Sequence, residues 1–178
     1  SSKYYFNGSI DQIRIYDSAL SAANVTTLYN EIECPAVAVT NAFNTVLYTG
    51  NGTNLTVTGV GFQPDWVWIK SRSNVREHIL CDSVRGVNKE LSSDNTYFEE
   101  SRGVNSFDTN GFTLDGLSAN YNSNNESYVA WNWKAGGAAV ANTDGTVTTQ
   151  VSANVDAGFS IVKYTGNGGN ATLGSGLE

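Results

Sequence analysis

The chain has 178 residues and a mass of 19.1 kDa, and only 15% of its residues are charged, well below the roughly 25% usual in soluble domains. Its 40% apolar residues suffice for a core, and its 18 glycines accompany many Asn, Ser and Thr residues, which favours strands and turns over long helices. The net charge of −7 disfavours nucleic acid and anionic membrane surfaces as partners, since both require a concentrated basic face. Membrane insertion is not expected either, because no apolar run reaches the length of about 18 residues that a spanning helix needs.

The beginning of the chain indicates a piece of a longer protein. It starts with Ser1 and Ser2, contains no Met and runs directly into a strand-like pattern. The two cysteines, Cys34 and Cys81, lie in different segments without metal-ligand spacing. We expect a buried free thiol at each, while a disulfide between them stays open.

One strand and one short helix are predicted near the amino terminus. Residues 10–16 end in apolar and polar alternation, with Ile13 and Ile15 on one face, as in a half-buried strand. Ser21 is a suitable N-cap for a helix over residues 21–30. Apolar residues then recur at helical spacing, namely Ala22, Val25, Leu28 and Tyr29.

The run from Phe6 to Ser21 resembles the closing motif of laminin-G-like (concanavalin A-like) jelly rolls, with Gln12 in place of the family's usual Glu. The resemblance implies that residues 1–33 are the truncated C-terminal end of such a domain. It also implies a possible Ca²⁺ ligand at Asp11, since some members of the group hold Ca²⁺ with a residue there. A single Asp makes no cation site alone, so a structural role for Asp11 stays open.

Residues 34–42 are predicted to be a linker, and short strands separated by Gly, Asn and Ser turns follow. The strands are expected at residues 45–48, 55–58, 65–70, 78–82, 111–114 and 127–134. The pair Asn51-Gly52 is typical of a type I′ turn, so we expect the first two strands to form a hairpin. The predicted fold class is all-β, with jelly-roll or β-sandwich modules in tandem and the one short helix at 21–30.

An internal repeat supports the tandem arrangement. The frame F-x-x-V/I-x-Y-T-G-N-G begins at Phe43 and again at Phe159. We therefore expect a complete module at 43–137, a connector at 138–155 and a truncated second copy at 156–178.

Four segments of the first module, in their order, resemble a repeated module of tail-fibre and other structural proteins of marine bacteriophages. They are residues 61–70, 82–86, 106–114 and 128–137. The resemblance implies a structural component of a virion appendage that contributes to host-surface attachment. It also implies homo-oligomers, plausibly trimers, contacts with other virion proteins, and a host-surface glycan as a further partner. A secreted bacterial adhesin or lectin, or the non-catalytic part of a polysaccharide-degrading enzyme, remains an alternative.

The tryptophans are the candidate ligand-binding residues. Trp66 and Trp68 alternate on one predicted strand, and Trp131 and Trp133 alternate on another, so each pair shares one face of its strand. Such pairs can form a platform for sugar rings, but aromatic core packing explains them as well.

No catalytic constellation is recognisable, and we expect no enzyme activity from this segment. The single histidine, His78, has no nucleophile placed beside it by any known motif. Asp82 and Arg85 are expected to fix a loop, and the acidic pair Glu99-Glu100 and Asp94 are expected to lie in a solvated loop. No cofactor is predicted apart from the possible Ca²⁺.

Overall fold

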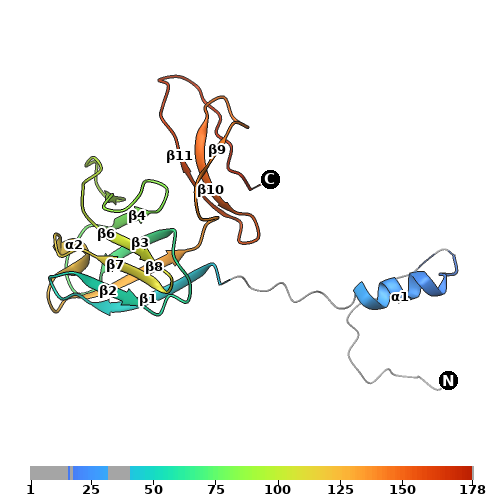
Figure 1. The fold of residues 1–178 in the computed structure, drawn as a ribbon, viewed down its shortest axis with the longest axis horizontal. Helices are drawn as coiled ribbons and strands as arrows, with labels where there is room; N and C mark the ends of the chain where they lie inside the picture. The colour runs from blue at the N-terminus through green and yellow to red at the C-terminus, as the bar shows by residue number, and fades with distance from the viewer. Residues whose placement is uncertain (1–15, 17, 32–40, 178) are drawn as a thin grey trace, which may run out of the picture. The chain divides into compact units, whose positions relative to one another are not determined.

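The computed structural model describes residues 16, 18–31 and 41–177. The chain divides into two units, residues 1–38 and 39–178, and each is described by itself (Figure 1). Residues 10–15 of the predicted strand lie outside the described residues, as do Cys34, Asp11 with most of the laminin-G-like resemblance, and most of the predicted linker.

The described part of the first unit contains the predicted helix. It is α1 (Ala22–Glu31), and Ser21 caps it, because the backbone N–H of Asn24 donates to Ser21 Oγ at 3.2 Å. The backbone N–H of Val25 donates to the Ser21 carbonyl at 3.0 Å, which closes the first turn. The helix prediction is confirmed.

A five-stranded antiparallel sheet forms the larger layer of the second unit, in the order β1-β8-β3-β4-β5. Its strands are β1 (Phe43–Thr49), β8 (Ser127–Trp133), β3 (Trp66–Ser71), β4 (Ile79–Asp82) and β5 (Leu91–Ser92). The first four were predicted as short strands between turns, and their positions are confirmed.

A three-stranded antiparallel sheet forms the second layer, in the order β2-β7-β6. Its strands are β2 (Leu55–Thr58), β7 (Gly111–Leu114) and β6 (Val104–Asp108). A register shift between Val104 and Ser106 marks a bulge in β6, a strand that the sequence analysis did not predict. A short helix, α2 (Ala119–Asn122), precedes β8 and is capped by Ser118.

The two sheets enclose one hydrophobic core, which makes residues 43–133 a β-sandwich. The large sheet contributes Val67, Ile69 and Ala130, and the small sheet contributes Phe112 and Leu114, all fully buried. The all-β prediction is therefore confirmed for the described residues, with two short helices as the exceptions.

The predicted hairpin at Asn51-Gly52 is wrong, because β1 and β2 belong to different sheets. Only Gly52 of the pair has a positive φ, of 70°, whereas a type I′ turn requires it at both residues. The Asn51 carboxamide instead accepts the backbone N–H of Thr53 at 2.9 Å, and the backbone N–H of Asn51 donates to Asn122 Oδ1. The segment is thus fastened to the end of α2 and carries the chain from one sheet to the other.

A third antiparallel sheet follows the sandwich, in the order β11-β10-β9 (orange to red in Figure 1). Its strands are β9 (Val140–Asn142), β10 (Thr149–Asn154) and β11 (Phe159–Lys163). The predicted connector therefore contains two strands that the sequence analysis did not place there. The strand β11 opens the second copy of the repeat, and Gly168 has a φ of 76°, close to the 70° of its counterpart Gly52.

Candidate functional site

The four candidate tryptophans lie together on one face of the large sheet. The register pairs Trp66 with Trp133 and Trp68 with Trp131 across β3 and β8. Side chains alternate along a strand, so the same face carries all four, while Val67 and the other intervening residues point into the core. All four are half-buried and lie outside the core cluster. We call this surface the aromatic face.

The rings form two cross-strand rows, defined by the register. The Trp66 row contains Phe43, Trp133 and Trp66, with ring centroids 4.9 Å apart for Phe43 and Trp133 and 5.1 Å apart for Trp133 and Trp66. These spacings are those of stabilising aromatic pairs. The row therefore runs across three strands without a gap.

The Trp68 row contains Thr45, Trp131 and Trp68. The indoles of Trp68 and Trp131 meet edge to face at a centroid distance of 5.7 Å. Trp68 Nε1 donates a hydrogen bond of 3.1 Å to His78 Nδ1, just before β4. The single histidine thus orients an indole, a contact that the sequence analysis did not find because the end of β3 and a loop separate the two side chains.

The third sheet packs on the two tryptophans of the Trp66 row and leaves Phe43 half exposed. The Phe159 ring stacks on Trp66 at 5.6 Å and 15°, and on Trp133 at 6.1 Å and 22°. Next to it, Ile161 lines a cavity of about 230 Å³ together with Trp66 and Leu80. One row of the aromatic face is therefore occupied by the chain itself, and no counterpart of Phe159 stacks on Trp68 or Trp131 in the described part of the chain.

Residues 134–137 follow β8 and lie against the third sheet, and we call them the strap. The strap and the rings around Phe159 together form the contact between the sandwich and the third sheet, which we call the joint. Asn154 Nδ2 donates to the carbonyl of Lys134 at 3.1 Å, and Ser152 Oγ donates to the carbonyl of Gly137 at 2.7 Å. Gly136 lies so close to β10 that an added Cβ would stand 2.1 Å from the Ala153 carbonyl oxygen. Only glycine permits this approach.

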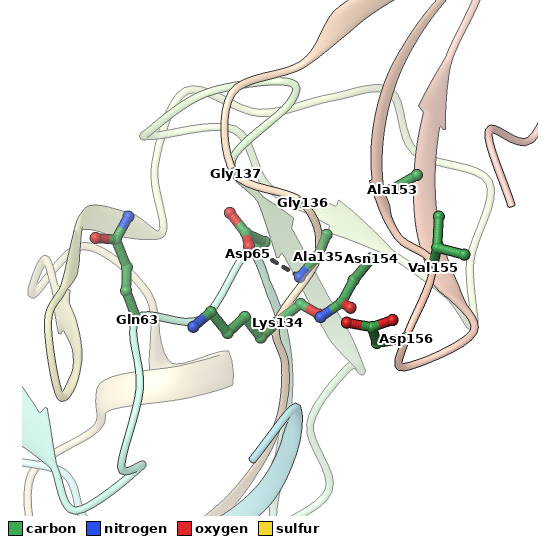
Figure 2. Close-up of a pocket in the computed structure, with 10 residues that line it drawn as sticks. All are labelled: Gln63, Asp65, Lys134, Ala135, Gly136, Gly137, Ala153, Asn154, Val155 and Asp156. Carbon is green, nitrogen blue, oxygen red and sulfur yellow. Dashed lines mark hydrogen bonds between the residues drawn. The ribbon is translucent and has the colours of Figure 1, made fainter. Parts of the chain in front are cut away.

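A polar cleft of about 610 Å³ opens beside this strap (Figure 2). The side chains of Gln63 and Lys134 lie on one side of it, and Asp156 projects from the turn between β10 and β11. Asp65 lies at its base, buried, where Oδ1 accepts Ser83 Oγ and Oδ2 accepts the Ala135 N–H, both at 2.8 Å. Both carboxylate oxygens of Asp65 thus accept hydrogen bonds from the protein itself, and the bond to Ala135 holds the strap in place. Asp65 therefore has a structural role beside the cleft.

The charged side chains singled out in the sequence fix loops. Arg85 Nε bonds Asp82 Oδ2 at 2.5 Å, and its guanidinium also donates to the Leu80 carbonyl. Glu99 bonds Arg85 and Lys89 at 3.2 and 3.1 Å, while Asp94 Oδ1 accepts a backbone N–H. The loop-fixing role predicted for Asp82 and Arg85 is confirmed.

The remaining candidates concern metals, thiols and membranes. Within residues 16, 18–31 and 41–177, no cluster of three or more His, Cys, Asp or Glu side chains could hold a metal ion. The predicted free, buried thiol is confirmed at Cys81, where burial raises the pKa to about 12. Neither described helix is long and apolar enough to cross a bilayer.

The joint residues Phe159 and Gly136 were missed as functional residues, although the sequence contained a signal for the first. The repeat frame aligns Phe159 with Phe43, but it does not say that Phe159 contacts the preceding copy. Gly136 lies in the segment 128–137, whose sequence gives no sign of the backbone that approaches it.

Comparison with known proteins gives one result. No curated protein and no solved structure matches the chain. One family model matches residues 38–178, which include the whole sandwich, the strap and the third sheet. The chain therefore belongs to the family described as "Domain of unknown function (DUF7483)".

Proposed function

We propose that this chain is a structural part of a phage virion appendage, such as a tail fibre, and that it contributes to attachment at the host surface. The observation that carries the proposal is the joint, in which the first strand of the second copy packs on the aromatic face of the first. An appendage must project a binding end away from the particle. Tandem modules that each bury a core and contact their neighbours provide that length.

The module's motifs support the virion assignment by resemblance. Each of the four segments forms a defined part of the structure. Residues 61–70 contain most of β3, and residues 82–86 contain Arg85 and its loop. Residues 106–114 contain β7 and part of β6, and residues 128–137 contain most of β8 and the strap. They thus form parts of the sandwich and of the joint, in keeping with a module whose motifs serve folding and assembly. The negative charge and the Asn- and Thr-rich surface suit an extracellular location.

The Trp68 row supports the attachment role. Trp68 and Trp131 are half-buried and lie outside the core cluster. Indole faces stack on the apolar faces of sugar rings, so the ligand class is a host-surface glycan. The polar cleft near Lys134 offers hydrogen-bonding side chains beside the strap.

The rival assignments share the fold and differ in where the protein acts. A secreted bacterial adhesin or lectin would carry the same modules outside a virion, and a polysaccharide-degrading enzyme would carry its catalytic domain elsewhere in a longer protein. For the virion protein we expect homo-oligomers, plausibly trimers, and contacts with other virion proteins.

Purified particles of the virus that encodes the chain provide the test. Mass spectrometry should detect peptides of this chain at a constant ratio to the major capsid protein, and immunogold labelling should place them on an appendage. Detection only in the culture supernatant, away from particles, would refute the virion assignment and favour the adhesin. Turnover of a host polysaccharide that requires residues of this segment would refute the non-enzymatic role.

A further inference from the structure

The strand that opens the second copy presents one row of side chains to the first copy. Phe159, Ile161 and Lys163 alternate along β11 and so point the same way. Phe159 stacks on Trp66 and Trp133, and Ile161 lines the small cavity beside them. Lys163 Nζ donates to the backbone carbonyl of Val84, the residue before Arg85, at 3.3 Å. All three residues of this outer row therefore contact the sandwich.

The first copy has the same row on β1. The repeat frame aligns Phe43, Thr45 and Leu47 with the three residues of β11. Phe43 is 50% exposed and Leu47 is 62% exposed, so the row is largely uncovered by the described residues. Among the described residues β1 is an edge strand of its sheet, so the row lies at a border where a neighbour can approach.

We propose that the outer row of the module's first strand is a docking surface whose partner is the aromatic face of another copy of the module. The second copy shows the pair engaged, with the β11 row on the Trp66 row. The uncovered β1 row is then the same surface for a further copy. The inference rests on the tandem assembly in the proposed function, but it holds equally for an adhesin built from these modules.

This pairing holds neighbouring copies in a fixed orientation, whereas copies joined only by a flexible linker would rotate independently. Stacked rings resist rotation about the strap, and the hydrogen bonds of Asn154 and Ser152 fix its length. Phe159, at the start of the second copy, makes the stacking contacts. Without its ring the two copies should remain connected by the strap but no longer pack on each other.

The test uses ¹⁵N relaxation of the full chain to compare the tumbling of the third sheet with that of the sandwich. In the wild type both should share one correlation time. Phe159→Ala should separate the two values and raise amide exchange in β11 by about tenfold or more, while Phe159→Tyr keeps the stack and should restore both. Phe98→Ala is the matched control, since it removes a phenylalanine ring that is 83% exposed and that stacks on neither Trp66 nor Trp133.

A second variant tests whether the two rows are the same kind of surface. Ile161→Thr with Lys163→Leu gives β11 the side chains of β1, and docking should persist, with amide exchange within about threefold of wild type. Separate tumbling in the wild type, or unchanged docking in Phe159→Ala, overturns the joint. Loss of docking in the row-exchange variant overturns the shared surface. Neither result depends on whether the protein is found in virions, so the two proposals fail separately.

Discussion

Replacement of Gly136 by Ala should undo the joint between the sandwich and the third sheet. The added Cβ would stand 2.1 Å from the Ala153 carbonyl oxygen and 2.9 Å from the Ala153 nitrogen. Even weak C–H···O contacts keep the carbon about 3.3 Å from the oxygen, so the strap and β10 must separate by about 1 Å. Both obstacles are backbone atoms, and no side-chain rotation can relieve the overlap.

The loss of docking free energy can be estimated from the interactions that this separation breaks. The Ser152–Gly137 and Asn154–Lys134 hydrogen bonds hold the strap at this distance, and each contributes about 1 kcal/mol. Weakened stacking of the third sheet on the Trp66 row adds about 0.5–1.5 kcal/mol. We therefore expect a loss of about 2.5–3.5 kcal/mol in docking free energy, near the upper end of the range usual for overpacked sites.

Hydrogen exchange followed by mass spectrometry measures this loss. Peptides from β9 to β11 should exchange about 30-fold faster or more in Gly136→Ala, because 1.4 kcal/mol corresponds to a factor of ten, while β2 and β7 keep their protection. Gly166→Ala is the control, since a Cβ there meets open space. Equal exchange in the two variants would refute the argument that close backbone approach holds the joint.

Three further predictions concern the sandwich. Gly50→Ala puts a Cβ 2.2 Å from a backbone carbonyl oxygen of the α2–β8 loop and should lower the calorimetric melting temperature by about 5 °C, whereas its repeat counterpart Gly166→Ala should leave it unchanged. Hydrogen bonds from Arg76 lower the pKa of Glu126 to about 2, so the carboxylate stabilises the fold above the unfolded pKa of about 4.3, and this contribution is lost as the pH falls toward 2. Glu126→Gln should therefore unfold at lower urea than wild type at pH 7, and the difference should vanish near pH 2. Because burial raises the pKa of Cys81 to about 12, its peptide should resist iodoacetamide at pH 8 in the native protein and be alkylated once urea unfolds the sandwich.

Local patterns were enough to predict α1 and most strands of the sandwich. Ser21 followed by apolar residues at helical spacing specifies the start of α1, and its hydroxyl makes the expected capping bond. Alternation along residues 65–70 and 127–134 specifies β3 and β8, because each strand buries one face against the small sheet. In these segments local preference and tertiary packing agree.

The hairpin failed because turn chemistry specifies a bend but not the partner strand. Asn51-Gly52 does form a tight turn, stabilised by the Asn51 side chain. Strand pairing, however, is decided by packing over the whole module, where β1 gains a neighbour in β8 and β2 gains one in β7. A dipeptide signal carries no information about strands that lie so far along the chain.

The strands β9 and β10 were missed because their residues resemble a linker. Small and hydroxyl side chains such as Thr149 and Ser152 are poor core formers, yet both are fully buried, along with Val151. They suit a place where two backbones approach closely, as at Gly136 and Ala153. A composition that indicates a flexible connector is therefore equally suited to a tight joint, and only the position of the approaching backbone decides between them.

The aromatic face shows how the same sequence pattern can serve two roles. Trp-x-Trp occurs on both β3 and β8, and alternation requires all four indoles to share one face. Alternation does not decide which face becomes the core; the smaller Val67, Ile69 and Ala130 fill the space between the sheets and leave the indoles outside. Phe159 then stacks on one row and not the other, so the proposed assembly contact falls on the Trp66 row and the proposed glycan contact on the Trp68 row. The division arises from the repeat unit that follows, which is why neither row could be assigned a role from its own strand.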